Sequence, residues 1–104
     1  MNQPKTVPAH LMQDRHWRGT IHIFLKNEKL KYAAAPYVDL EEGVINSAGL
    51  KKISKPWSQS EKFMLNLALH LHGLSAKIDL SDMDYLDANN KAIAIEAIKL
   101  RFSI

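Results

Sequence analysis

The sequence contains no cysteine. Disulfide bonds, thiolate zinc sites and cysteine nucleophiles are therefore excluded. The 104 residues are enough for one hydrophobic core and leave little room for a second domain. Because small domains without disulfides are typical of compartments that keep thiols reduced, the sequence predicts a cytoplasmic location.

Long apolar runs are also missing. Lys, Asn, His or Glu interrupts every apolar stretch well before the roughly 18 residues that a membrane span requires, so we expect a soluble protein with no membrane partner. The N-terminus, MNQPKTVPAHLMQDRHWRG, lacks the continuous apolar segment of a secretory signal. Residues 1–9 carry two prolines and no periodicity, which predicts a loose arm before a single globular domain at 10–104.

Catalytic and ligand-binding motifs are equally scarce. The sequence has neither a Gly-x-Ser-x-Gly elbow nor a glycine-rich phosphate loop. His70 and His72 are two residues apart, which places them about 200° apart on a helix and prevents them from binding one metal together. The other histidines are scattered. We predict no catalytic residue, no metal site and no cofactor.

The stretch WSQSEKFMLNLALHLHG predicts a helix over residues 58–72. Ser58 and Glu61 have the spacing of a capping box, and Gly73 stands where a helix C-cap residue is expected. One continuous apolar face is joined by a second, narrow stripe formed by Leu65 and Leu69. This stripe is either buried in the core, which we favour, or forms an interaction surface for a second copy or a partner.

A second helix is predicted near the C-terminus, over residues 88–102, with Asp87 as its cap. Ser81 is expected to cap a short helical turn before it. The helix carries two apolar arcs, Ala94, Ile95, Ile98 and Phe102 on one and Ile93, Ala97 and Leu100 on the other. We expect it to pack on helix 58–72, with the N-terminal half completing the core.

The N-terminal half is ambiguous. Apolar and polar residues alternate in GTIHIFLK, so residues 19–34 could form a β-hairpin, but a helix fits almost equally well. Gly19 disfavours the helix by roughly 1 kcal/mol relative to alanine. Pro36 ends this segment, and the stretch that follows is expected to be irregular with at most short strands. The sequence predicts a mainly α, single-domain fold, with an α+β fold containing an N-terminal hairpin as the alternative.

Positive charge is concentrated in the first half of the chain. Residues 1–56 carry nine Lys or Arg against five Asp or Glu, whereas residues 57–104 carry five against six. Lys51, Lys52 and Lys55 precede Trp57, so phosphate contacts with base stacking are conceivable. The more ordinary interpretation is a solvated lysine face with a tryptophan that anchors the helix start.

Three stretches, YVDLEEGVINSAGL, PWSQSEKFMLNLALHLHG and YLDANNKAIAIEAIKLRF, resemble a family of small uncharacterised proteins of Firmicutes found in phage and integrative-element contexts. The shared features are the turn Glu41-Glu42-Gly43, the pair Gly49-Leu50, Trp57 with its helix, and the ending 96–102. The resemblance implies a mainly helical fold and favours a helix over 15–25. It implies no activity and no catalytic residue.

Three hypotheses follow from these patterns. The first is a non-enzymatic protein-interaction module encoded by a phage or mobile element, and one version of it is a homodimer formed through Leu65 and Leu69 or through the last helix. The second is a nucleic-acid-associated accessory protein that uses Lys51, Lys52, Lys55 and Trp57. The third is an enzyme of unrecognised type.

Overall fold

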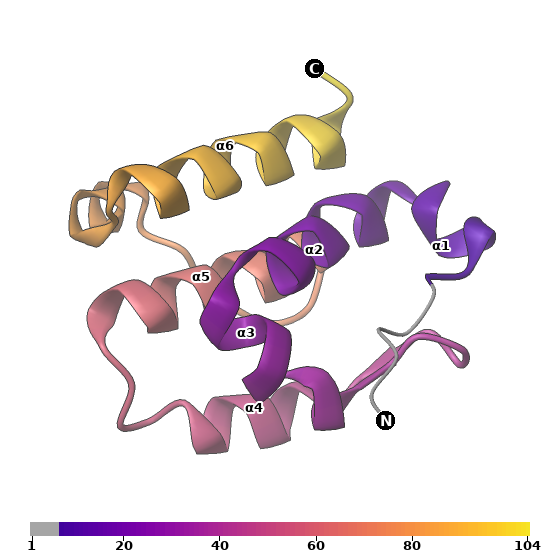
Figure 1. Ribbon diagram of the computed structural model, residues 1–104, viewed down its shortest axis with the longest axis horizontal. Helices are drawn as coiled ribbons and strands as arrows, with labels where there is room; N and C mark the ends of the chain where they lie inside the picture. The colour runs from indigo at the N-terminus through magenta and orange to yellow at the C-terminus, as the bar shows by residue number, and fades with distance from the viewer. Residues whose placement is uncertain (1–6) are drawn as a thin grey trace.

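The computed structural model describes residues 7–104 and confirms a mainly α fold (Figure 1). The helices are α1 (Ala9–Met12), α2 (Arg15–Lys26), α3 (Glu28–Ala33), α4 (Ser47–Ile53), α5 (Gln59–His72) and α6 (Ala88–Phe102). Two 3-10 helices, η1 (Ala35–Tyr37) and η2 (Leu80–Tyr85), and two short strands, β1 (Val38–Asp39) and β2 (Val44–Ile45), complete the description.

The ambiguous N-terminal half is helical, so the alternative of a β-hairpin over residues 19–34 is wrong. The Asp14 side chain accepts from the backbone N–H of His16 and caps α2, and the Asn27 side chain accepts from Leu30 and caps α3. The residues that alternate in GTIHIFLK belong to a helix whose one side is buried in the core. Six of the twelve α2 residues are buried. Tertiary packing of that face outweighs the propensity cost of Gly19.

Helix α5 begins and ends as predicted and forms the centre of the core. Both hydrogen bonds of the Ser58–Glu61 capping box are present, and Gly73 adopts the left-handed conformation at φ 93°. Leu65 and Leu69 are 1% and 0% exposed. The reading of these two leucines as an interaction surface is therefore wrong, because this chain itself covers the second stripe.

Helix α2 packs against both α5 and α6, which supplies the N-terminal layer that the sequence predicts (Figure 1). Gly19 lies against the backbone of Ala97, and the Asn27 side-chain amide donates to the Asn90 side-chain oxygen at 2.9 Å. Earlier residues of α2 thus meet later residues of α6, so the two helices run antiparallel. A Cβ added to Gly19 would lie 2.5 Å from the Ala97 carbonyl oxygen, which explains why glycine stands at this crossing.

The middle segment is more ordered than predicted. Strands β1 and β2 pair antiparallel around a turn in which Gly43 has a φ of 68°. Helix α4 follows, capped by Asn46, and its Leu50 is fully buried. Helix α4 was not predicted, because its seven residues include a glycine and bury only one side chain completely.

The structure also bears on the predicted N-terminal arm and on the short helix before α6. Residues 1–6 of the predicted arm lie outside the described residues, while Val7 packs against a small satellite cluster formed by Leu11, Trp17 and Ile21. The short helix before α6 is capped by Asp79 instead of Ser81: the Asp79 carboxylate accepts from both the backbone N–H and the hydroxyl of Ser81. These bonds lower the pKa of Asp79.

Candidate interaction surfaces

The outer face of α6 exposes apolar side chains. Ile95 is 46% exposed and Phe102 is 56% exposed. The sequence places both on the same apolar arc as Ala94, but Ala94 is fully buried. The buried side of α6 consists of Ile93, Ala94 and Ala97. Because both arcs of this helix are apolar, the sequence held no signal that could identify which arc faces solvent.

The four residues proposed for nucleic-acid contact do not form one free surface. The Lys51 ammonium group donates to the Ser75 carbonyl oxygen, which ties α4 to the loop after α5. Trp57 is partly buried against the main core, and the Lys29 ammonium group lies 4.9 Å from the centre of its ring. Lys52 and Lys55 are exposed. The structure therefore uses Lys51 and Trp57 in internal contacts, as the ordinary interpretation of Trp57 expects.

The histidines at the end of α5 are separated, as the spacing predicts. His70 is exposed, and its Nδ1 lies 2.9 Å from the Ala76 carbonyl oxygen. The His72 ring packs edge-to-face with Trp17, with centroids 4.5 Å apart and an interplanar angle of 87°. Neither ring nitrogen of His72 is accessible or has a hydrogen-bond partner among the described residues. Burial, reinforced by the neighbouring His16, lowers the pKa of His72.

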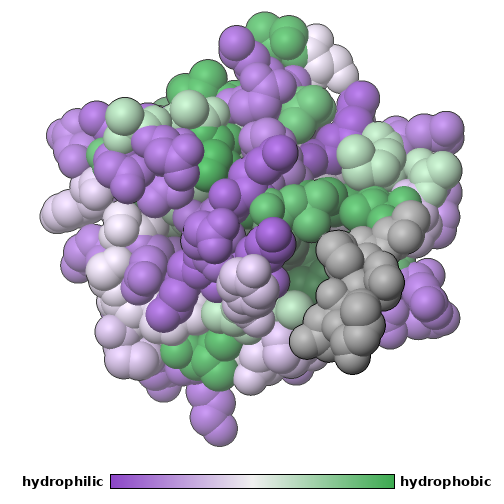
Figure 2. Space-filling view, in the orientation of Figure 1, coloured by the Kyte–Doolittle hydropathy of each residue, from purple (hydrophilic) through white to green (hydrophobic). Residues whose placement is uncertain are grey.

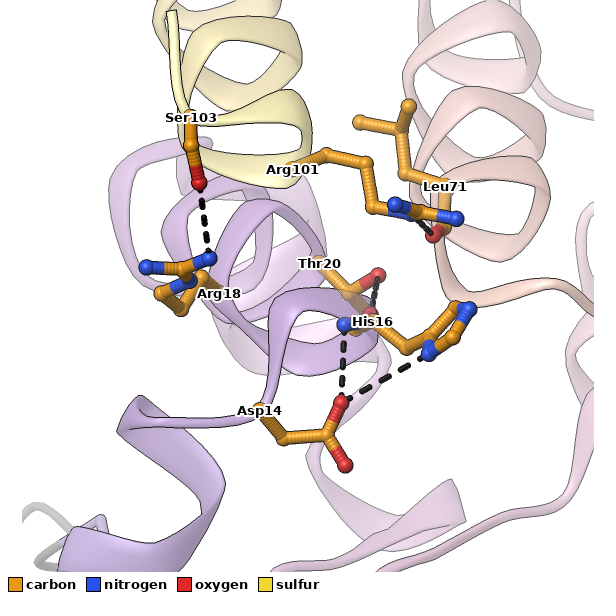
Figure 3. A network of polar contacts seen from close by, with 7 residues as sticks. All are labelled: Asp14, His16, Arg18, Thr20, Leu71, Arg101 and Ser103. Carbon is orange, nitrogen blue, oxygen red and sulfur yellow. Dashed lines mark hydrogen bonds and ion pairs between the residues drawn. The ribbon is translucent and has the colours of Figure 1, made fainter.

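A polar junction joins the N-terminal end of α2 to the C-terminal ends of α5 and α6 (Figure 3). The Arg101 Nε–H donates to the Leu71 carbonyl oxygen at 2.8 Å, which satisfies a backbone acceptor near the end of α5. On the other side of α6, Arg18 donates to the Ser103 hydroxyl at 3.1 Å. These arginines point to different partners, so the junction fastens three helices and does not form a single anion site.

Two hollows indent the described surface. One, of about 750 Å³, is lined by residues 35–41 together with Val44 and Asn46. The second, of about 350 Å³, lies between α2 and α6 and includes His22, Lys26 and Glu96. Burial lowers the pKa of His22, while the nearby Glu96 carboxylate acts in the opposite direction. Neither hollow contains a nucleophile held by a base.

Two features are absent from residues 7–104. No three side chains of His, Asp or Glu gather closely enough to hold a metal ion in this part of the chain. None of its helices combines the length and the apolar character that a bilayer crossing requires. Comparisons of the chain with protein-family models, with curated proteins and with solved structures find no match.

Proposed function

We propose that the protein is a non-enzymatic protein-interaction module and that a second copy of the chain binds the outer face of α6. The exposure of Ile95 and Phe102 on one side of a well-formed helix is the observation that supports this proposal. Burying such side chains contributes roughly 25 cal/mol per Å² of apolar surface removed from water, which favours a partner on this face.

The spacing of the outer face favours a symmetric partner. Ala88, Ile95 and Phe102 repeat every seven residues, which is the repeat that keeps one stripe facing a partner helix. Two copies related by a two-fold axis through Ile95 would pair antiparallel, with Ala88 of one copy opposite Phe102 of the other. A small residue opposite a large one lets the two helices approach closely at both ends of the contact.

The size of this face predicts a weak association. Helix α6 has 15 residues and is therefore about 22 Å long. A contact confined to two such helices falls below the roughly 1,200 Å² of a standard interface, so we expect a dissociation constant of about 10 µM to about 1 mM. Lys99 lies among the apolar side chains of the same face and is exposed, which further limits the affinity.

Sedimentation equilibrium from about 10 µM to about 1 mM tests the proposal, because a dimer of this strength forms within that range. The wild-type chain should show a rising average mass. Ile95→Glu should abolish the rise, because it places a charge at the centre of the contact.

Val44→Glu is the matched control. Val44 is also β-branched and is 56% exposed, but it lies on β2, away from α6. This variant should dimerise like the wild type. A wild-type chain that stays monomeric throughout the range, or equal loss of dimer in both variants, would contradict the proposal.

A further inference from the structure

The net positive charge of the chain is concentrated in α2 and α3. Residues 15–33 carry five Lys or Arg and one Glu, which gives +4. The remaining residues carry nine Lys or Arg and ten Asp or Glu, which gives −1, so the whole chain is +3. Helix α2 itself contains no acidic residue. Two adjoining helices therefore carry more positive charge than the entire protein.

The basic residues of α2 share its outer side. Arg15, Arg18, His22 and Lys26 follow one another at intervals of three or four residues, which places them on one face of a helix. Arg15 and Lys26 are exposed, and Arg18 and His22 are partly exposed. In the space-filling view, hydrophilic side chains cross the middle of the molecule over α2 and α3 (Figure 2). We call these four residues the basic face of α2.

Carboxylates do not neutralise the cations of this face. Among residues 7–104, the ion pairs join only His16 to Asp14 and Lys29 to Glu61, so Arg15, Arg18 and Lys26 have no carboxylate within 4.0 Å. Asp14 is engaged as the cap of α2. Glu96 of α6 is the one acidic residue of the hollow beside His22 and Lys26. Arg15, Arg18 and Lys26 therefore keep their positive charge without a carboxylate partner, although Arg18 also donates to the Ser103 hydroxyl.

The basic face is long enough to span several phosphates of a nucleic-acid backbone. Arg15 and Lys26 are eleven residues apart, about 16 Å along the helix. One strand of a DNA duplex presents a phosphate about every 3.4 Å of its axis, so this face spans about five phosphates. Arginine also binds phosphate through two parallel N–H groups. We propose that the basic face of α2 binds the phosphate backbone of a nucleic acid, a site different from Lys51, Lys52, Lys55 and Trp57.

The test is the fluorescence anisotropy of a labelled DNA duplex of about 20 base pairs, titrated with the protein at several KCl concentrations. With Arg15, Arg18 and Lys26 each neutralising one phosphate, the logarithm of the binding constant should fall with the logarithm of salt with a slope of about −2.7. Between 50 and 200 mM KCl this slope corresponds to an affinity loss of about 40-fold.

Two double variants with equal charge loss identify the site. Arg15→Gln/Lys26→Gln should weaken binding in 50 mM KCl and reduce the slope to about −0.9, because one of the three contacts remains. Lys52→Gln/Lys55→Gln removes the same charge from exposed positions outside α2 and should keep the wild-type slope. All four substitutions are at exposed positions, so circular dichroism should show an unchanged fold.

Three results would overturn the inference. The first is no binding of the wild-type chain to the duplex in 50 mM KCl. The second is an equal loss of affinity in the two double variants, which would indicate attraction by net charge alone. The third is binding to poly-glutamate with no binding to DNA, which would assign the basic face to an acidic protein. The dimer measured by sedimentation is a separate readout and does not affect any of these outcomes.

Discussion

The hydroxyl of Thr20 donates to the main-chain carbonyl of Ala68 at 2.7 Å, in a fully buried contact between α2 and α5. This bond joins two helices whose residues are 48 positions apart in the sequence. It gives the one hydroxyl group of α2 a hydrogen-bond acceptor in the core, where the Thr20 side chain is 0% exposed.

Replacing Thr20 with valine keeps the shape of the side chain but sets a methyl group against the Ala68 carbonyl oxygen. We expect the free energy of unfolding to fall by about 1–3 kcal/mol, because a buried bond is lost and no polar group replaces it. Urea denaturation measures the change. Thr20→Ser keeps the hydroxyl and should cost less than Thr20→Val; the reverse order would show that the methyl group matters more than the bond.

The crossing of α2 and α6 should not tolerate a side chain at Gly19. Alanine has the better helix propensity by about 1 kcal/mol, but its Cβ would lie 2.5 Å from the Ala97 carbonyl oxygen. We expect Gly19→Ala to destabilise the protein by about 1–3 kcal/mol through overpacking of backbone against backbone. Arg15→Ala, at an exposed position of the same helix, should change the midpoint little. A Gly19→Ala variant as stable as wild type would mean that α6 shifts away easily.

The buried and exposed apolar residues of α5 and α6 should respond very differently to truncation. Leu69→Ala leaves a cavity in the centre of the core and should lower the free energy of unfolding by about 2–5 kcal/mol. Ile95→Ala, on the outer face of α6, should change it by about 0.5 kcal/mol or less when measured at a concentration where the chain is monomeric. Comparable losses at the two positions would contradict the assignment of inner and outer faces.

The contact of His72 with Trp17 predicts a pH-dependent stability. The pKa of His72 is lowered below its ordinary 6.5 in the folded protein, so the unfolded chain binds more protons between the two values. The contribution of His72 to the free energy of unfolding should be constant above about pH 6.5. It should fall as the pH decreases through 6.5 toward the pKa of His72 in the folded protein. The pKa of His22 is also lowered and contributes with the same sign.

His72→Phe provides the matching control, since it keeps a ring against Trp17 and cannot take up a proton. The pH dependence should become shallower without vanishing, because His22 remains. At neutral pH this variant should also be as stable as wild type or up to about 1 kcal/mol more stable, because two unpartnered nitrogens are removed. Urea midpoints between about pH 8 and pH 5 test both statements, and an unchanged pH profile in His72→Phe would contradict them.

The sequence predicted the elements whose signals are local. The Ser58–Glu61 box and Gly73 gave α5, and Asp87 gave α6, because caps and turns act within a few residues of where they stand. The nature of residues 19–34 depended on a contact 78 residues away, the approach of Gly19 to Ala97, which no local pattern encodes. When that contact is not known, Gly19 indicates only a residue of low helix propensity.

The candidate surfaces were harder to predict than the fold, for a related reason. A helix with two apolar arcs is expected to pack against other protein surfaces on both sides. For α5, the rest of this chain supplies both surfaces and buries Leu65 and Leu69. For α6, the chain covers Ile93, Ala94 and Ala97 and leaves Ile95 exposed, although Ala94 and Ile95 belong to the same predicted arc. Deciding between these cases needs the positions of neighbouring helices. The same holds for the lysines, because only the tertiary structure brings the Ser75 carbonyl to Lys51 and Lys29 to Trp57.

The antiparallel packing of α2 on α6 also has a consequence for how the protein is made. Translation proceeds from the N-terminus, so α2 leaves the ribosome roughly 60 residues before α6 begins to follow. During that interval, the side of α2 around Gly19 that packs on α6 has no cover. Helix α6 is synthesised well after α2 and closes the core beside it, and a nascent chain that has not yet reached Ala88 exposes that apolar surface to chaperones or to aggregation.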